Sequence, residues 1–589
     1  MLVNRFDRCY PEGILKPRSG VHVVTTKRRY EDREYRAHLL RRSYREGGKV
    51  KKETVGNITV LGDELVAVVR AGLRGEQVGV LDALLPPVRS RPHGHVRAVS
   101  RAMERLGLAK LLASRASKER SIILALVAQR LLSPGSKLAC TRKWHTTSLA
   151  DVFAVADVRV DEVEGAMDWL IERKGRIEEK LAARHVSEGT PTLFDVSSSY
   201  VEGSKNELAA FGHNRDKKRG KRQVNYGVLT DALGRPVALR VFPGNTSDPA
   251  ALRAALVDVR ASFGLREVLL VGDRGMITSK HVREFQADDP SIQWISALRA
   301  KEIQKLMLGG AFQSSLFEET NLVEFESSAF PGERLVACRN PLLAAERAHH
   351  REALLRASGE KRDAIARRVA NGRLKAEKTI ALKVGAALEQ HKMGKHFLLE
   401  IREGHFSYAR NPESINREAA TDGVYVIRSN ASASQHSAAD LVRRYKDLRH
   451  VEQLFRALKG VDLAARPIRH RKADRTSAHL FICLLAYYVR WYLERAWATL
   501  TYRDHDPIDP DERDPVAAAQ RSDAADQKAA KHTTPDGDPA HSFTTLLESL
   551  GTIVRNTHQH RESGATFTLD TTPTPHQQHA LELVETINP

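Results

Sequence analysis

The sequence predicts an α/β protein in which helices cover a mixed β-sheet. Two patterns predict this class. Between residues 190 and 300, short runs of β-branched and aromatic residues alternate with turn residues, which is typical of strands. Between residues 62 and 186, the apolar residues recur at helical spacing instead. At roughly 150 residues per domain, the chain is long enough for two to four domains.

The charge balance favours a polyanionic partner. The chain has 93 Lys and Arg against 73 Asp and Glu, a formal net charge of +20. Nucleic acid is the commonest partner of so basic a protein, and a basic protein without such a partner is the alternative.

The cysteines and the apolar runs indicate a cytoplasmic protein. The cysteines stand far apart and show neither metal-ligand nor disulfide-framework spacing, so we expect reduced thiols. They are Cys9, Cys140, Cys338 and Cys483. The first residues do not resemble a signal peptide, and the longest apolar run, 480–489, is too short to cross a bilayer. We therefore expect no membrane segment.

The first 186 residues change from β-like to helical character. Residues 1–61 contain β-like pieces, and Gly47-Gly48 predicts a hairpin turn. Residues 62–186 are expected to be a helical, DNA-binding region. Within it, Ser117 is a predicted N-cap and Pro134 follows the end of the same helix.

The sheet is predicted from five apolar runs. The first three are joined by loops too short for crossovers, so we expect antiparallel neighbours. The later runs are separated by the predicted helices 248–264 and 278–286, which allow parallel pairing and give a mixed sheet. The five runs are 192–197, 224–230, 236–242, 267–273 and 293–298.

The second half of the chain interrupts this pattern and then resumes it. Residues 300–420 contain short strands and a charged helical run. A strand at 422–430, a helix bearing Glu452 and an apolar helix at 475–499 follow. Residues 503–542 are rich in Asp, Pro and Ala and are expected to be a disordered linker before a helical tail.

The helix bearing Glu452 is expected to span residues 438–459. Ser437 and Asp440 fit a capping box, and Gly460 fits a C-terminal stop. On a helical wheel, one face of about 80° holds a mixed set of polar residues, and the apolar residues gather on another flank. The polar set is Tyr445, Arg449, Glu452, Arg456 and Lys459. Ordinary salt bridges on an exposed helix are the alternative role for Glu452.

Two further carboxylates follow or interrupt apolar strands. Asp195 lies inside one apolar run, where a charge is costly unless it is used or paired. Asp273 lies just past the end of another, where open α/β sheets place their sites. A satisfied buried Asp and a turn residue before Gly275 are the alternatives. Three carboxylates form a hard-oxygen site suited to two Mg²⁺ ions, or Mn²⁺, which promote phosphodiester cleavage.

These residues resemble the DDE transposases of bacterial insertion sequences, in particular the branch with a Tyr-Arg-Glu-Lys signature around the catalytic Glu. Three other stretches are similar to the family: 133–139, 211–248 with its PGNTSD ending, and 466–488. The resemblance covers roughly residues 120–500. Tyr445, Glu452 and Lys459 fit the signature. Its Arg position is Leu448, and Arg449 follows it.

The resemblance implies a ribonuclease-H-like core, split by an inserted subdomain, with Asp195, Asp273 and Glu452 as the catalytic and metal-binding triad. It implies that residues around Glu452 contact double-stranded DNA at the transposon ends, and that a homodimer joins two ends. The expected DNA contacts are Tyr445, Arg449, Arg456 and Lys459. The division expected from the sequence is a β-rich region 1–61, a helical region 62–186, a first core part 187–299, an inserted α+β subdomain 300–420, a second core part 421–500 and a disordered linker with helical tail 501–589.

The stretch 214–222 is a second candidate DNA contact. As a flexible basic loop it would grip the DNA backbone, and a solvated hairpin loop is the alternative. Its expected contacts are Lys217, Lys218, Arg219, Lys221 and Arg222. The sequence thus predicts a transposase that binds terminal inverted repeats, hydrolyses phosphodiester bonds and transfers strands. The alternatives are a non-catalytic DNA-binding derivative and a related metal-dependent nuclease.

Overall fold

The computed structural model describes most of the chain and divides it into two compact units. The described residues are 20–30, 33–74, 85–187, 189–254, 268–277, 282, 292–312, 317, 321–509, 512–561 and 563–589. The first unit comprises residues 1–90 and 555–570, and the second comprises residues 91–554 and 571–589. Each unit is described by itself.

The first unit contains a three-stranded antiparallel sheet in the order β1-β2-β3. Its elements are β1 (Gly20–Tyr30), β2 (Arg33–Glu46), β3 (Lys49–Asn57), the 3-10 turn η1 (Thr59–Leu61) and helix α1 (Gly62–Leu73). Gly47 and Gly48 join β2 to β3 with φ angles of 59° and 78°. Two successive positive φ values are what a tight hairpin turn needs, so the predicted turn is confirmed.

A second small sheet, ordered β16-β15-β4, joins segments from opposite ends of the sequence. Its strands are β4 (Pro87–Pro92), β15 (Val554–Gln559) and β16 (Thr566–Asp570). β4 interrupts the region expected to be helical, and the hairpin β15–β16 lies in the tail expected to be helical. Pairing with distant strands supplies the hydrogen bonds that local sequence patterns do not indicate.

The second unit begins with a helical layer. Its elements are α3 (Gly94–Arg105), α4 (Leu108–Leu112), α5 (Lys118–Leu132), α6 (Lys137–Lys143), η2 (Trp144–Thr146), α7 (Leu149–Val152) and α8 (Val160–His185). Ser117 caps α5 by accepting a hydrogen bond from the Arg120 backbone N–H at 3.2 Å, as predicted. The long apolar helix α17 (Ala473–Ala496) packs against α5, α8 and the main sheet, and most of its side chains are buried.

The main sheet has eight strands in the order β10-β11-β14-β9-β8-β5-β6-β7. They are β5 (Pro191–Tyr200), β6 (Gln223–Asp231), β7 (Pro236–Pro243), β8 (Val268–Val271), β9 (Ile292–Ala297), β10 (Leu322–Phe325), β11 (Arg334–Arg339) and β14 (Val424–Ser429). β5, β6 and β7 are antiparallel, whereas β5–β8 and β8–β9 pair in parallel. The predicted mixed α/β sheet, of the ribonuclease-H-like class, is therefore confirmed.

The two expected crossover helices fall largely outside the described residues. Residues 248–254 are helical, as predicted, and the remainder of 248–264 is not described. Of the second predicted helix, 278–286, only residue 282 is described.

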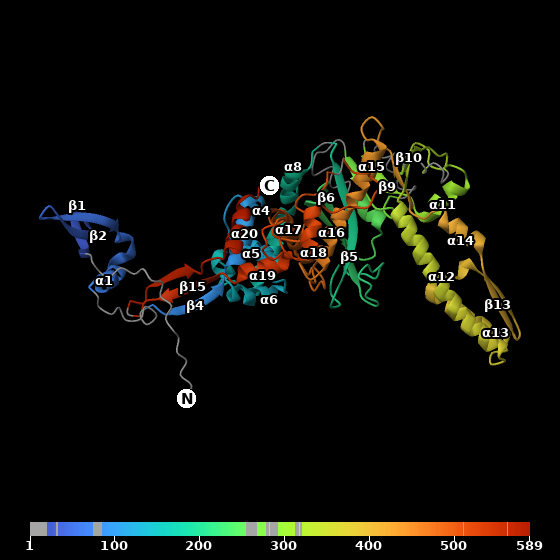
Figure 1. Ribbon diagram of the computed structural model, residues 1–589, viewed down its shortest axis with the longest axis horizontal. Helices are drawn as coiled ribbons and strands as arrows, with labels where there is room; N and C mark the ends of the chain where they lie inside the picture. Colours follow the sequence, from blue (N-terminus) through green and yellow to red (C-terminus); the bar gives the residue numbers. More distant parts are fainter. Residues whose placement is uncertain are drawn as a thin grey trace. The chain divides into compact units, whose positions relative to one another are not determined.

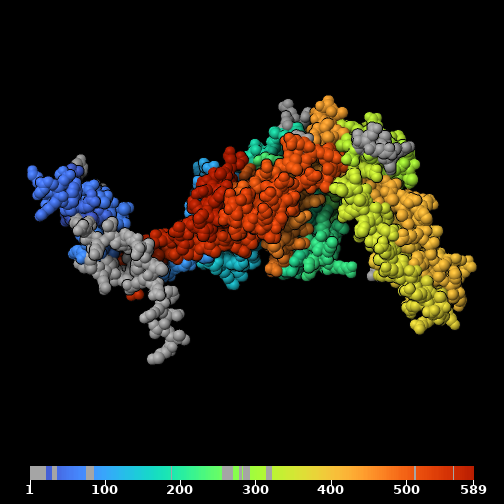
Figure 2. Space-filling model, viewed as in Figure 1, coloured from blue at the N-terminus to red at the C-terminus, as the bar shows by residue number. Residues whose placement is uncertain are grey.

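The inserted region begins later than expected. β10 and β11 extend the main sheet through β14, so residues 300–420 are not one separate subdomain. Buried apolar residues of β11, such as Leu335 and Val336, explain why these strands join the core. The rest forms an arm with helices and a hairpin (Figures 1 and 2). After α11 (Ala300–Leu308), the arm contains α12 (Pro341–Ala370), α13 (Glu377–His391), β12 (Phe397–Arg402), β13 (His405–Arg410) and α14 (Pro412–Ala419).

The described residues of the segment 503–542, which was expected to be a disordered linker, are folded. It contains α18 (Asp523–Lys531) and is followed by α19 (Phe543–Gly551) and α20 (Pro575–Glu585). The buried Lys528 ammonium donates to the carbonyls of Ala498 and Arg503 at 2.7 and 2.6 Å. Figure 2 shows this orange-red segment as part of the packed surface. Composition predicted disorder because the few apolar anchors, such as Val516, are diluted by charged residues.

Candidate active site

Asp195 and Asp273 lie side by side on two adjacent parallel strands, Asp195 within β5 and Asp273 just after the end of β8. In the register of β5 and β8, Leu193 pairs with Val271. Two residues further along both strands, Asp195 stands level with Asp273, which follows the end of β8. Asp195 Oδ1 accepts a hydrogen bond from the Val196 backbone N–H, and Asp273 Oδ1 accepts one from the Arg274 backbone N–H, both at 2.7 Å. The strand order thus brings together two residues that are 78 positions apart in the sequence.

The electrostatic environment of Asp195 disfavours its charged form. Burial, with the nearby carboxylates of Asp273 and Asp248, raises the pKa of Asp195 to about 7, against the lowering effects of the Val196 backbone N–H and Arg215. Arg215 itself is paired with Asp248 of the PGNTSD stretch at 2.5 Å. The Asp195 carboxyl therefore lacks a close cation of its own.

Glu452 lies on the second of two consecutive helices, α15 (Ala438–Lys446) and α16 (Leu448–Lys459). The predicted single helix 438–459 is interrupted at Asp447, and this corrects the expectation. The predicted capping box is confirmed: the Ser437 hydroxyl accepts from the Asp440 backbone N–H at 3.1 Å, and Asp440 accepts from the Ser437 backbone N–H at 3.1 Å. Burial of the Asp447 carboxyl raises its pKa to about 6.

The apolar flank of α16 packs on the same face of the sheet that carries Asp195. Phe455 meets the ring of Tyr226 edge-on, with 5.8 Å between centroids. Tyr226 pairs with Ser197 across β5 and β6, and Ser197 shares a strand face with Asp195 because alternate residues of a strand point the same way. Leu448, at the Arg position of the signature, is buried in this packing, while Arg449 is exposed.

Contacts on either side of Glu452 hold its helix over the strand ends. On one side, the Tyr445 hydroxyl donates to Asp273 Oδ1 at 3.4 Å. On the other, the Lys459 ammonium donates to Ser197 Oγ at 3.1 Å. Within α16, Glu452 lies seven residues, or about two helical turns, before Lys459, so the two side chains share one side of the helix. Burial and the charges of Asp273 and Glu452 raise the pKa of Tyr445, which keeps it a hydrogen-bond donor.

The three carboxylates do not close into a metal cage by themselves. Within the described ranges, no three His, Cys, Asp or Glu side chains are grouped closely enough to hold a metal ion. The donor set nevertheless suits a hard divalent cation, because it consists of carboxylate oxygens. Mutual repulsion between Asp195 and Asp273 is the condition that a bound cation would relieve. These residues therefore fit a divalent cation chemically, and Glu452 is exposed.

Lys459 lies inside the protein rather than on an open surface. Its ammonium pairs at 2.7 Å with Asp216, whose side chain is fully buried. Arg466 pairs with the same carboxylate at 2.5 Å. Burial lowers the pKa of Lys459, against the opposing effect of Asp216. Lys459 thus anchors α16 to the loop that contains Asp216, a role that the helical wheel did not indicate.

The basic loop 214–222 extends from this anchor. Lys217, Lys218, Arg219 and Lys221 are exposed, as a DNA-binding loop requires. Arg222 is half-buried and donates to the Ser204 carbonyl at 3.0 Å. The loop therefore presents four basic side chains to solvent, close in sequence to the Asp216 anchor.

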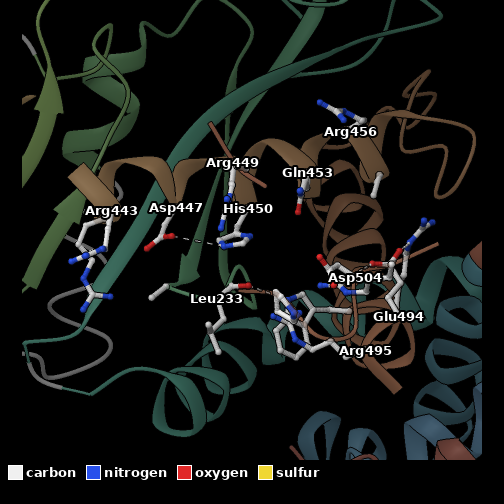
Figure 3. A pocket seen from close by; sticks show the side chains of 18 of the residues that line it. Leu233, Arg443, Asp447, Arg449, His450, Gln453, Arg456, Glu494, Arg495 and Asp504 are labelled. Carbon is white, nitrogen blue, oxygen red and sulfur yellow. Dashed lines mark hydrogen bonds and ion pairs between the residues drawn. The ribbon is translucent and has the colours of Figure 1, made fainter. Parts of the chain in front are cut away.

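A large basic cavity adjoins the Glu452 helix. It has a volume of about 960 Å³ and is lined by eight arginines against six carboxylates. Figure 3 shows Arg449, His450 and Gln453 of α16 directed toward the side where Leu233, Arg495 and Asp504 lie. Its arginines are Arg443, Arg444, Arg449, Arg456, Arg490, Arg495, Arg503 and Arg513.

Several of these arginines are available for a ligand. Arg444, Arg449, Arg456 and Arg513 form no ion pair with any described carboxylate. Burial and the charge of Arg503 lower the pKa of Arg495 to about 10. Sequence reasoning identified Arg449 and Arg456 but missed the rest, because α15, α16, α17 and the segment after α17 each supply part of the set.

Among the described helices, none is by itself long and apolar enough to cross a membrane. One bent pair, Lys118–Leu132 with Lys137–Thr146, passes on length and composition alone.

Comparisons with known proteins identify the family. The family model described as the transposase DDE domain matches residues 187–489, more than half of the 589 residues. The model described as the N-terminal domain of IS1634 family transposases matches residues 23–77. No curated protein matches the chain. A solved structure, the cryo-EM structure of a piggyBac transposase synaptic complex with hairpin DNA, is similar with 8% identity and a TM-score of 0.33, covering 78% of this chain and 76% of that chain. The chain belongs to the DDE transposases of bacterial insertion sequences, enzymes that cleave DNA and transfer its strands.

Proposed function

We propose that Asp195, Asp273 and Glu452 form the catalytic triad of this transposase. The observation that carries the proposal is the arrangement at the strand ends. Asp195 and Asp273 are level in adjacent parallel strands, and Tyr445 and Lys459 hold the Glu452 helix over them from both sides. Membership of the Tyr-Arg-Glu-Lys branch stays a prediction, since Leu448 replaces the signature Arg.

Two Mg²⁺ ions, or Mn²⁺ in their place, would be held by these three carboxylates. Bound there, the metal would lower the pKa of the attacking water or 3′-hydroxyl and stabilise the departing oxygen. The chain's own residues prepare the site for this. The Tyr445 hydroxyl orients Asp273, and the repulsion around Asp195 favours a cation over a proton as pH rises.

The DNA strand would lie along the basic residues beside Glu452. Arg449 and Arg456 border the basic cavity without an ion-pair partner, so they are free to bind phosphates. The exposed basic residues of the loop beside Asp216 would bind the phosphate backbone of the DNA as well. They are Lys217, Lys218, Arg219 and Lys221. Tyr445 and Lys459 act by positioning the helix. Arg222 acts by bracing the loop through its bond to Ser204.

The DNA partner would be the terminal inverted repeats of the element, with a homodimer joining two ends. A nuclease that cuts without joining is the second candidate, and the test below separates the two.

The test uses a duplex that carries the terminal repeat flanking the gene, with Mg²⁺ and a target plasmid. We expect Asp195→Asn, Asp273→Asn and Glu452→Gln each to abolish cleavage and joining while binding of the duplex is retained. Glu202→Gln is the matched control, because Glu202 follows the same strand as Asp195 but forms an exposed ion pair with Arg469 at 2.9 Å. Cleavage that survives any of the three substitutions would contradict the triad. Cleavage without joining by the unmodified protein would indicate a nuclease.

A further inference from the structure

The two faces of the N-terminal sheet β1-β2-β3 differ in charge. Because alternate residues of a strand point to opposite faces, the strand register assigns each side chain to a face. Helix α1 packs on one face, which we call the helix face, where the Nε2 of the buried His38 lies 2.6 Å from Asp63 of α1. The opposite face, which we call the basic face, carries the neighbours of His38 along the strand, Ala37 and Leu39, and every second residue from them.

On the helix face, two basic residues pair with carboxylates of the same sheet. Arg42 pairs with Glu53 at 2.9 Å, and Lys51 pairs with Glu46 at 2.6 Å. Glu46 and Glu53 are the strand carboxylates whose side chains are described, and both lie on this face by register. Arg42 and Lys51 are therefore partly neutralised within the sheet.

On the basic face, no described carboxylate balances the charge. Arg41 lies opposite Thr54, Ser43 lies opposite Lys52, and Arg45 lies two residues further along the same strand. Arg28 of β1 lies on this face as well, opposite residue 35. Arg28, Arg41, Arg45 and Lys52 form no ion pair among the described residues, and all but the half-buried Arg41 are exposed.

We propose that this basic face binds duplex DNA, with the sheet lying against the major groove. A cluster of unpaired cations interleaved with hydroxyl groups such as Ser43 and Thr54 matches a row of phosphates and base edges. Three strands about 4.8 Å apart make a sheet roughly 10 Å wide, and the major groove is about 12 Å wide. The inference rests on the proposed function, because the DNA would be the end duplex on which the triad acts. It assigns end recognition to a unit other than the one that holds the triad.

The chain offers a matched test, because Arg41 and Arg42 are neighbours on opposite faces, as are Lys51 and Lys52. The double variant R41Q/K52Q removes two charges from the basic face. The double variant R42Q/K51Q removes the same two charges from the helix face. Binding of the full-length variants to a fluorescent duplex carrying the terminal repeat is measured by anisotropy in EDTA over a range of salt concentrations.

We expect R41Q/K52Q to bind at least about tenfold more weakly, with a log Kd against log salt slope smaller by about 2, because each lost phosphate contact removes about one unit of slope. We expect R42Q/K51Q to bind within about twofold of the unmodified protein. Equal weakening by both pairs, or by neither, would overturn the proposal.

Two further variants keep the result decisive. R28Q/R45Q removes the other two charges of the basic face and should weaken binding similarly, and unchanged binding would count against the proposal. R41K/K52R keeps the charges and should bind nearly as the unmodified protein does, and a loss of binding in this folded variant would also count against it.

Because binding is measured without metal, failure of this proposal leaves the proposal of cleavage by the triad untouched. Cleavage that survives Asp195→Asn would overturn the triad and leave the binding result standing.

Discussion

Two aspartates near the Glu452 helix, Asp216 and the half-buried Asp195, have opposite surroundings. Asp216 is fully enclosed and has two cations in contact, Lys459 at 2.7 Å and Arg466 at 2.5 Å. Asp195 of β5 has no ion pair with any described cation, two carboxylates nearby and a pKa raised to about 7. The protein can therefore satisfy a buried carboxylate where it needs an anchor. The lack of such a partner at Asp195 supports the proposal that this carboxylate binds a cation from solution.

The roles of the two aspartates are distinguished most clearly when each carboxylate is neutralised by substitution and both cleavage and stability are measured. We expect Asp195→Asn to lower the cleavage rate by on the order of a thousandfold, because several kcal/mol of transition-state stabilisation depend on the ligated metal. Gel-based cleavage of the end duplex at equal occupancy measures this. An Asp195→Asn protein that cleaves normally would remove the distinction between the two residues.

Asp216→Asn should instead damage the fold. Removing one partner of a buried ion pair leaves the other charges unpaired and costs about 3–5 kcal/mol of the free energy of unfolding. Urea denaturation monitored by Trp fluorescence measures the loss. Glu202→Gln, which breaks an exposed pair, should cost no more than about 1 kcal/mol. Equal costs for the two substitutions would mean that Asp216 is not an anchor.

The pH dependence of stability sharpens the comparison. In the unfolded chain Asp195 ionises near pH 4, and in the folded protein at about 7, so the folded state binds the extra proton between these values. Stability therefore falls as pH rises from about 4 to about 7 and stays lower above it. We expect a loss of about 2 kcal/mol in EDTA, after allowance for partial exposure of the side chain.

Thermal unfolding at about pH 5 and about pH 8 tests this, with Asp195→Asn as the control that lacks this component of the pH dependence. Mg²⁺ should restore stability to the unmodified protein at the higher pH and have no such effect on Asp195→Asn. A metal effect of equal size in both proteins would place the cation elsewhere.

The smallest expected effect concerns Tyr445. Tyr445→Phe removes the hydrogen bond to Asp273 and should cost about 1 kcal/mol, seen as a severalfold lower cleavage rate at limiting Mg²⁺. Saturating Mg²⁺ should recover most of the rate, because the hydroxyl orients Asp273 without touching the substrate. A rate defect that Mg²⁺ does not relieve would assign Tyr445 a contact with DNA instead.

Local patterns predicted much of this molecule. Alternation and turn residues located the strands around Asp195, and the capping box at Ser437 was correct. The wheel placed Glu452 among basic residues, and the exposed Arg449 and Arg456 agree with it.

The errors share one physical cause, which is pairing between distant segments. A wheel cannot tell that Lys459 turns toward a buried Asp216, 243 residues earlier in the chain. Strand pairing with β14 drew β10 and β11 into the core sheet, and packing against distant helices ordered the acidic segment after residue 501. Such tertiary contacts override composition and local propensity.

The basic cavity has a consequence for how the protein comes into being. One of its walls consists of residues 503–509, and Lys446 is tied to the Ala517 carbonyl at 2.9 Å. When the ribosome has synthesised the helix that contains Glu452, it has made all three proposed metal ligands but has not yet made this wall. A polypeptide that ends before residue 503 would contain all three acidic residues but would lack this wall of the cavity. Premature termination should therefore yield a product that has the proposed metal ligands but not the complete basic cavity.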